Sequence, residues 1–373
     1  MQLIEGDEHV KVLAAMSGGV DSAVAAARAA EAGHEVVGVH MALSKNRDQR
    51  RTGSRGCCTV EDASDARRAA DRIGIPYYVW DLSDDFHDLV VEDFLTEYAA
   101  GRTPNPCVRC NERIKFASLL ERATLLGFNA VCTGHYASIR SEGPGGAPSL
   151  HRSRNDAKDQ SYVLAVMGPE AVGRSLFPLG DFEDKQAVRE EARARGLGVS
   201  TKPDSYDICF IADGDTRGFL ERSLGEAPGE VVDPDGTVLA THTGTHGYTI
   251  GQRKGLGIQH PAPNGRPRYV VDIDPARRQV VVGASELLST RELHATDVIS
   301  FEELTEGRPV HAQIRAHGEA VPAVVQQVPA PDAPGSLLQV RLDTPVRGVA
   351  PGQTLVLYDG DRVLAAATLE RRA

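Results

Sequence analysis

The first half of the chain alternates short apolar runs with stretches of helical periodicity. The apolar runs predict buried strands at Val10 to Ala15, Val36 to Met41, Tyr77 to Leu82 and Ala130 to Thr133. Between and after them the 3.6-residue pattern predicts helices, each followed by a glycine, at Ala23 to Ala32, Glu61 to Ile73, Asp88 to Ala100 and Asn111 to Leu126. This alternation is typical of parallel strands joined by crossover helices. The sequence therefore predicts an α/β fold with a doubly wound parallel sheet.

The pattern changes after Asp204. Helical periodicity nearly disappears, and short β-branched runs such as Tyr269 to Ile273 and Gln279 to Val282 are separated by glycine, proline and aspartate turns. Such spacing is typical of small all-β domains. We therefore expect an α/β domain at residues 1–204, a small central domain at 205–274 and a C-terminal β-barrel at 275–373.

Composition narrows the class of protein. The chain has 373 residues, 41% of them hydrophobic and 25% charged, which is typical of a globular protein with more than one core. The first residues do not resemble a secretory signal, and no apolar run is long enough for a bilayer span, so we expect a cytoplasmic protein. In that reducing compartment, close cysteines are metal ligands, redox pairs or nucleophiles.

The formal net charge of −11 argues mildly against a nucleic-acid partner. Local basic groups still permit one, because the field at a surface depends on its own charges. One such group contains Arg102, Arg109, Arg113 and Lys115, and another surrounds Arg253 and Lys254. A solvated charged face is the alternative interpretation of each group.

A phosphate-binding loop is predicted directly after the first strand. Ser17-Gly18-Gly19-Val20-Asp21-Ser22 lies between that strand and the next helix. Glycines let the backbone approach a polyphosphate closely, and amides at a helix N-terminus point at the anion. The run lacks the Gly-Lys-Ser/Thr ending of a Walker loop and resembles the loop of the ATP pyrophosphatases. An ordinary glycine turn is the alternative.

Two cysteines outside that loop are candidates for chemistry. Cys110 is expected near the first turn of a helix and beside Arg109, and both features favour its thiolate. With Cys107 it could instead form half of a structural zinc site, but no second spaced pair follows. On pattern alone, Cys209 is a buried strand cysteine. Adjacent Cys57 and Cys58 predict a loop turn of unknown role.

Five further motifs accompany the loop in order along the chain. They are Asn105 to Phe116, Thr133 to Tyr136, Lys158 to Tyr162, Asp207 to Ile211 and Gly247 to Ile258. With these motifs the chain resembles the bacterial tRNA-specific 2-thiouridylases of the PP-loop superfamily. The resemblance implies a sulfurtransferase that uses ATP and Mg²⁺ to adenylate C2 of the wobble uridine in glutamate, glutamine and lysine tRNAs, and then inserts sulfur.

The resemblance also implies roles for individual residues. Cys209 would receive a persulfide sulfur from a cysteine desulfurase or a sulfur-relay protein, and Cys110 would form a disulfide with it as the sulfur is released. The residues implied at the ATP site are Ala15, Met16, Ser17, Gly18, Gly19, Val20, Asp21, Ser22, Met41 and Gly134. Those implied at the tRNA are Asn105, Pro106, Cys107, His135, Lys158, Asp159, Gln160, Arg315, Ala316 and Gln353.

One departure from the family leaves an alternative open. Many relatives have an aspartate where this chain has Cys107, so Cys107, Cys110 and Cys209 could together hold a 4Fe-4S cluster with one open iron. Another PP-loop adenylating synthetase is the rival enzyme class, although those enzymes need no such cysteine pair. His242 and His246 could suggest a metal, but their turn-like setting favours a structural role. The sequence identifies neither the sulfur donor nor the oligomeric state.

Overall fold

The computed structural model describes residues 10–44, 60–141, 146–203, 208–211, 213–260, 262, 265–329 and 337–371. The chain folds into two compact units. The first contains residues 1–91, 106–214 and 360–363, and the second contains 92–105, 215–359 and 364–373. Each unit is described separately below. Cys57 and Cys58 lie outside the described residues.

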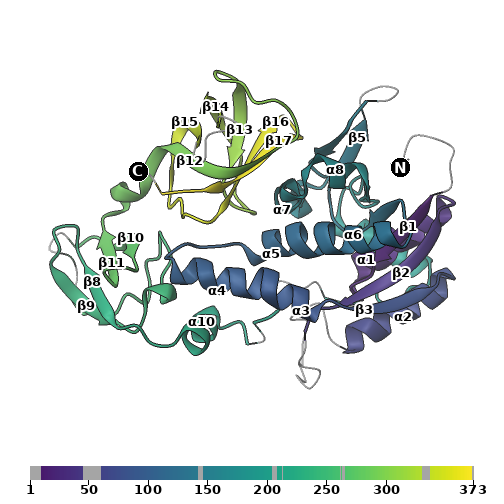
Figure 1. The fold of residues 1–373 in the computed structure, drawn as a ribbon, viewed down its shortest axis with the longest axis horizontal. Helices are drawn as coiled ribbons and strands as arrows, with labels where there is room; N and C mark the ends of the chain where they lie inside the picture. The colour runs from purple at the N-terminus through teal and green to yellow at the C-terminus, as the bar shows by residue number, and fades with distance from the viewer. Residues whose placement is uncertain are drawn as a thin grey trace. The chain divides into compact units, whose positions relative to one another are not determined.

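A five-stranded parallel sheet organises the first unit (Figure 1). Its order is β3-β2-β1-β4-β7, with bounds Tyr77–Asp81, Glu35–Ala42, Lys11–Ala15, Ala130–Cys132 and Ser175–Leu176. All neighbouring pairs are parallel. This architecture confirms the predicted α/β class.

Helices supply the rest of the first unit. The α-helices are α1 (Val20–Glu31), α2 (Val60–Ile73), α3 (Ser83–Phe86), α5 (Pro106–Arg109), α6 (Leu119–Leu125), α7 (Ser161–Leu164), α8 (Gly168–Gly173) and α9 (Lys185–Ala194). Two π-helical stretches, η1 (His87–Val91) and η2 (Cys110–Ser118), continue α3 and α5. The 3-10 turns are η3 (Asp156–Lys158) and η4 (Ala165–Met167), and β5 (Ser138–Ser141) and β6 (Pro148–His151) form a hairpin.

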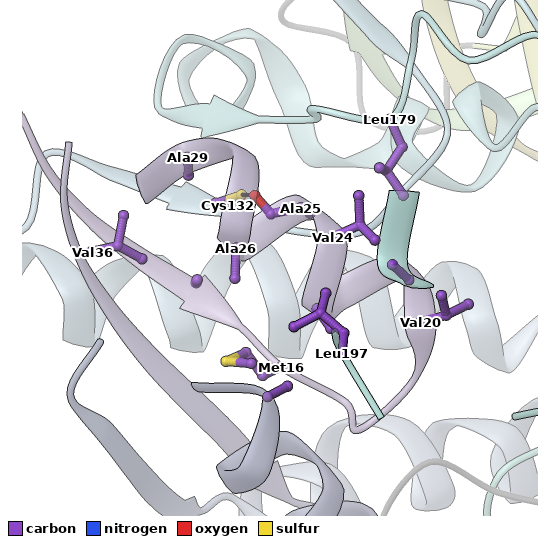
Figure 2. Close-up of a cluster of buried hydrophobic side chains, with 14 of the residues drawn as sticks. Met16, Val20, Val24, Ala25, Ala26, Ala29, Val36, Cys132, Leu179 and Leu197 are labelled. Atoms are coloured by element: carbon purple, nitrogen blue, oxygen red, sulfur yellow. Dashed lines mark hydrogen bonds between the residues drawn. The ribbon is translucent and has the colours of Figure 1, made fainter. Parts of the chain in front are cut away.

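The core of the first unit lies between α1 and the sheet (Figure 2). Alternate residues of a strand face opposite sides, so Val12 and Ala14 join this cluster, whereas Leu13 is buried elsewhere. The apolar face of α1 consists mainly of alanines, which lets the helix approach closely. Cys132 belongs to this cluster: its thiol donates to the carbonyl of Ala25 at 3.6 Å, and burial raises its pKa to about 12. Cys132 is therefore a core residue.

The second unit contains a small mixed sheet and a closed barrel. The small sheet has the order β10-β11-β8-β9, with bounds Tyr269–Asp274, Gln279–Gly283, Gly229–Val232 and Val238–His242. Because β10 and β11 form an antiparallel pair, this sheet continues past residue 274, which the sequence analysis gives as the end of the central domain. The 3-10 turns η5 (Thr245–Gly247) and η6 (Ser285–Leu288) follow β9 and β11.

Six antiparallel strands make the barrel. Their order is β12-β15-β14-β13-β16-β17, and pairing of β12 with β17 closes it. The bounds are Ser289–Ser300, Leu338–Arg347, Val321–Gln327, Pro309–Gln313, Thr354–Asp359 and Arg362–Leu369. Closure leaves no edge strand in the ring and confirms the predicted C-terminal barrel.

Two helices complete the second unit, α4 (Glu92–Ala99) and α10 (Thr216–Leu224). The sequence analysis missed α10, in a region read as nearly free of helices. Asp215 caps it by accepting a hydrogen bond from the amide of Gly218 at 2.9 Å. Leu220 is its buried side chain, so the helix has little of the apolar periodicity by which helices are recognised.

Two buried histidines lie beside the small sheet. His242 is 6% exposed and His246 7% exposed, and the His242 ring lies 5.5 Å from the ring of Tyr248. Burial lowers the pKa of both imidazoles, and nearby Arg217 lowers both further. Both rings are therefore neutral in the folded protein at neutral pH.

We expect these histidines to make the fold sensitive to acid. An unfolded histidine binds a proton near pH 6.5, so as the pH falls below that value the unfolded state gains protons that the folded state resists. Stability should decrease by about 1 kcal/mol per histidine at pH 5.5. Thermal unfolding at pH 7.5 and 5.5 measures this, and His246→Gln should reduce the difference. An unchanged difference in that variant would contradict the assignment.

Candidate active site

The predicted ATP-site residues gather at one edge of the parallel sheet. Strand β1 lies between β2 and β4, and successive strands are added in opposite directions from it. In such sheets ligands bind beyond the carboxyl ends of the strands at the point where the order reverses. Ala15 is the last residue of β1, Met41 is the penultimate residue of β2, and Gly134 follows β4. The structure thus brings together three segments that are far apart in sequence.

The loop from Met16 to Ser22 has a fixed internal geometry. The Ser22 hydroxyl accepts a hydrogen bond from the amide of Ser17 at 3.1 Å and donates to the carbonyl of Gly19 at 3.1 Å. Helix α1 begins at Val20, and Gly19, its N-cap, offers no side chain to its first amides. These amides and the positive end of the helix dipole form a site suited to a polyphosphate.

Two glycines are required by close contacts. Gly18 has a φ of +81°, and a Cβ there would lie 2.2 Å from the carbonyl oxygen of Asp62. A Cβ on Gly134 would lie 2.6 Å from the amide nitrogen of Ser22. No side chain fits at either position. The loop after β4 therefore lies directly against the start of α1.

The Asp21 carboxylate is held by two residues that the sequence analysis did not identify. The Tyr136 hydroxyl donates to one oxygen at 2.7 Å, and the Lys185 ammonium contacts the other at 2.5 Å. The ammonium also lies 5.7 Å from the centre of the Tyr136 ring. Tyr136 lies inside a motif that was recognised, whereas Lys185 begins α9 and had no motif to mark it.

His135, predicted to contact tRNA, is 8% exposed. Its Nδ1 is 2.8 Å from the Thr133 hydroxyl, and its Nε2 is 3.5 Å from the Lys115 ammonium. Burial, and then the charge of Lys115, hold its pKa well below the ordinary value. His135 is therefore neutral, and it links the β4 loop to the helix that bears Cys110.

The first part of the Lys158-to-Tyr162 motif is hydrogen-bonded to the loop after β4. The side-chain oxygen of Gln160 accepts a hydrogen bond from the backbone amide of Tyr136 at 2.9 Å. The backbone amide of Gln160 donates to the Tyr136 carbonyl at 2.8 Å. Asp159 accepts from the Ser161 hydroxyl at 2.7 Å and from Arg152 at 3.1 Å. These two side chains organise the turn, and their predicted tRNA contacts stay predictions, as does that of half-buried Lys158.

The helix carrying Cys110 begins earlier than the sequence predicts. It starts at Pro106, whose fixed φ suits a first helical position, and continues as the π-helical η2 from Cys110. Cys110 therefore lies beyond the first turn, and exposed Cys107 occupies that turn instead. Arg109 pairs with Glu112 at 2.8 Å, so its charge is shared. Both arguments made for a Cys110 thiolate are weaker than predicted.

Cys110 itself is 8% exposed. The next residue, Asn111, donates its side-chain amide to the carbonyl of Val163 at 3.1 Å, just beyond the Lys158-to-Tyr162 motif. Further along η2, Phe116 lies 6.1 Å from the His135 ring. π-helical stretches are rare and are frequent at functional sites. The structure therefore packs the cysteine-bearing helix against two other motifs.

Cys209 lies in a partly exposed turn rather than in a strand. Phe210 packs edge-to-face on Phe86 of α3, with ring centres 6.0 Å apart, and α3 also contacts η2. Both cysteine segments thus contact α3. Part of the predicted Asp207-to-Ile211 motif lies outside the described residues.

Three of the predicted tRNA residues belong to the second unit, besides Asn105 in the segment before α5. The Gln353 side chain donates to the carbonyl of Thr103. Arg315 donates to the carbonyl of Gly348 at 2.7 Å, and the Ala316 carbonyl accepts from Gln313 at 3.3 Å. Their tRNA roles stay predictions.

Within the described ranges, no three His, Cys, Asp or Glu side chains gather as ligands for a metal ion. Cys107, Cys110 and Cys209 therefore do not form a cluster site in this arrangement. None of the described helices combines the length and the apolar character needed to cross a bilayer.

Family models match three successive parts of the chain. Residues 10–213 match the tRNA methyl transferase HUP domain, residues 217–284 the tRNA methyl transferase PRC-barrel domain, and residues 290–369 the aminomethyltransferase β-barrel domain. The parallel sheet and its helix-bound loop thus define a HUP-domain protein with two β domains after it.

Curated relatives narrow this class to one family. The tRNA-specific 2-thiouridylases MnmA of Beutenbergia cavernae and Kineococcus radiotolerans are each 63% identical to this chain over 361 residues. These alignments cover 96% of the chain and 94% and 98% of the relatives, respectively. The chain belongs to the tRNA-specific 2-thiouridylase MnmA family, which confirms the predicted resemblance. A solved NMN synthetase from Francisella tularensis is 14% identical, covers 59% of this chain and 79% of its own, and has a TM-score of 0.34.

We expect Tyr136 and Lys185 to support nucleotide binding through Asp21. Tyr136→Phe removes one neutral donor and should weaken ATP affinity roughly three- to tenfold, whereas Lys185→Met leaves the carboxylate uncompensated and should weaken it roughly ten- to hundredfold. Calorimetric titration with ATP and Mg²⁺ measures both. Lys11→Met is the control, because Lys11 pairs with Glu35 at the exposed surface. Equal affinity in all four proteins would contradict the role.

Proposed function

We propose that this chain adenylates C2 of the wobble uridine in glutamate, glutamine and lysine tRNAs and replaces the C2 oxygen with sulfur. Its family makes it a tRNA-specific 2-thiouridylase, a sulfurtransferase, in agreement with the sequence analysis. Membership of that family also removes the reason to prefer another adenylating synthetase. The reaction steps, the tRNA set and the residue roles below are the proposal.

The phosphate loop supports the first step. Uridine O2 is a poor leaving group, and attack by this oxygen on the α-phosphate of ATP converts it into an adenylate and releases pyrophosphate. The amides at the start of α1 and the Lys185 ammonium would stabilise the charge on the departing pyrophosphate. Gly134 would let the nucleotide approach the β4 loop closely.

Asp21 fits a Mg²⁺ ion that arrives with ATP. Mg²⁺ is commonly held by one or two carboxylates together with substrate phosphates, and Asp21 supplies a carboxylate at the helix N-terminus. The ion would neutralise the polyphosphate when bound. Tyr136 and Lys185 hold the carboxylate in place beforehand.

The two cysteines support the second step. Cys209, in its partly exposed turn, would receive the terminal sulfur of a donor's persulfide, supplied by a cysteine desulfurase or a relay protein. The terminal sulfur then attacks C2 and AMP leaves. The Cys110 thiolate then attacks the sulfur atom of Cys209. A disulfide between the two cysteines forms as the bond between Cys209 and the transferred sulfur breaks. An external thiol must reduce this disulfide before the next cycle.

A 4Fe-4S route has less support in this structure. Cys107 is exposed, Cys110 is buried and Cys209 is intermediate, and the three do not gather as ligands. We therefore derive no step through iron.

The observation that carries the proposal is the convergence of motifs in the first unit. His135 belongs to the loop after β4, and it contacts Lys115 and Phe116 of the cysteine-bearing helix. Tyr136, the next residue, holds Asp21 of the phosphate loop. The proposed adenylation site and the thiol-bearing helix would thus share one short loop, and this arrangement supports adenylation followed by sulfur attack.

The test is formation of the product. Protein prepared without oxygen is incubated with ATP, Mg²⁺, a cysteine desulfurase with L-cysteine as the persulfide source, and unmodified glutamate tRNA, and digested nucleosides are analysed by mass spectrometry. We expect 2-thiouridine only when ATP is present, and nuclease mapping should place it at the wobble position. AMP and pyrophosphate without a thiolated nucleoside would mean that the loop is assigned correctly and the substrate wrongly.

Cysteine variants test the second step separately. Cys110→Ser and Cys209→Ser should each abolish thiolation when a cysteine desulfurase supplies the sulfur, while tRNA-dependent pyrophosphate release continues. Cys132→Ser is the matched control, because Cys132 lies in the core away from the proposed chemistry. Substantial thiolated product from either catalytic variant would reject the two-cysteine mechanism.

A further inference from the structure

Lys202 makes three hydrogen bonds that engage every donor of its ammonium group. It donates to the carbonyl of Gly18 at 3.1 Å, to Asp62 at 2.6 Å and to Asp65 at 2.6 Å. Gly18 belongs to the phosphate loop, and both aspartates lie in the first two turns of α2. An ammonium group has three N–H donors and no acceptor. With all three engaged, Lys202 has no donor left for a phosphate.

The charges around Lys202 do not attract an anion either. One ammonium group faces two carboxylates, so the cluster carries a net negative charge. The Lys202 side chain is 26% exposed, and burial by itself lowers its pKa. The hydrogen bonds to Asp62 and Asp65 outweigh burial, so the pKa is raised and the side chain stays charged. Any benefit of Lys202 to anion binding must therefore come from its contact with Gly18.

That contact orients the peptide between the two glycines of the loop. A trans peptide is planar, and its C=O and N–H point in opposite directions. Because Lys202 holds the Gly18 carbonyl, the amide of Gly19 is directed to the opposite side of that peptide. A carbonyl that faces a polyphosphate repels it, whereas a backbone amide binds it. Lys202 thus fixes the orientation that suits an anion.

Other carbonyls of the loop are held by neighbouring elements. The Met16 carbonyl lies 2.9 Å from Nδ1 of His40 in β2. The Gly19 carbonyl accepts a hydrogen bond from the Ser22 hydroxyl of α1 at 3.1 Å. The carbonyl between these two in sequence, that of Gly18, has its partner in Lys202, which lies far along the chain. The orientation of the loop therefore depends on one distant side chain.

We propose that Lys202 is a positioning residue of the phosphate loop, which holds the Gly18 carbonyl so that the Gly19 amide faces the bound polyphosphate. Lys202 itself does not contact the phosphates. Its hydrogen bonds are made by the protein's own groups, so the loop needs little reordering when a nucleotide binds, and this favours affinity. The inference rests on the proposed function, in which this loop holds ATP, and it assigns no chemical step to Lys202.

Affinity for ATP tests the positioning role. In calorimetric titration with ATP and Mg²⁺, Lys202→Met cannot hold the Gly18 carbonyl and should bind roughly tenfold more weakly than the wild type. Lys202→Arg keeps the charge and the donors, and it should recover most of the affinity. Arg28→Met is the matched control, because Arg28 forms a partly buried ion pair with Glu191 in the last turn of α1. This control should bind ATP as the wild type does.

The amide signal of Gly19 tests the orientation directly. Protein labelled with ¹³C at glycine carbonyls and ¹⁵N at glycine amides gives amide-to-carbonyl correlations only from consecutive glycines, which are Gly18-Gly19 and Gly145-Gly146. The variant Gly146→Ala assigns the two signals. Saturating ATP and Mg²⁺ should move the Gly19 amide proton downfield in the wild type, because this amide donates to a phosphate. Much of that shift should be lost in Lys202→Met at saturation.

The inference is overturned if Lys202→Met binds ATP as tightly as the wild type, or if Arg28→Met loses as much affinity. It is also overturned if bound ATP leaves the Gly19 amide of the wild type unchanged. Weaker binding with a full Gly19 shift in Lys202→Met would mean that Lys202 contacts the phosphates directly, and this too rejects positioning. If Lys202→Met does not fold, Lys202→Gln replaces it and should show the same losses.

These assays contain neither tRNA nor a sulfur donor, so they separate the inference from the proposed function. A protein that shows the expected Lys202 effects but forms no 2-thiouridine would refute the proposed function alone. A wild type that does not bind ATP would refute both.

Discussion

The seating of the phosphate loop against α2 is the constraint on which the site depends. Gly18 lies so close to the Asp62 carbonyl that no side chain fits, and its φ of +81° is one that other residues rarely adopt. The loop thus connects β1 to α1 and places the N-terminus of α1 beside β1, the strand at which the strand order of the sheet reverses. Gly134 repeats this requirement on the other side. Two close backbone contacts thus fix the position of this loop and of the N-terminus of α1.

Lysine side chains neutralise the carboxylates around the loop. Asp21 is countered by Lys185, and Asp62 and Asp65 are countered by Lys202. Without these lysines, three carboxylates would surround a site suited to a polyphosphate and would repel it. The overall charge of −11 is therefore a poor guide to the field at this site, because local pairing decides it.

The sequence predicted those features that depend on local pattern. Strands β1 and β2 and helix α1 follow from apolar runs and alanine-rich periodicity, and their observed ends lie within a few residues of the predicted ones. Tyr136, Lys185 and Lys202 could not be assigned these partners, because the partners lie far away along the chain. Nothing in the local sequence of a lysine specifies which distant carboxylate it meets.

Helix starts show the same limit on a smaller scale. Pro106 was interpreted as part of the loop before a helix, although proline also suits a first helical position, and this choice moved Cys110 from the first turn into the second. The chemical argument changes with it, because the effect of a helix dipole falls off within one turn.

The different exposures of the two proposed catalytic cysteines suit different tasks. A sulfur carrier must be reached by a donor protein, and Cys209 lies in a partly exposed turn. A resolving thiol that reacts early would waste the carried sulfur, and Cys110 is 8% exposed within a packed helix. These exposures are those that the proposed order of steps requires, in which sulfur is loaded on Cys209 before Cys110 meets it.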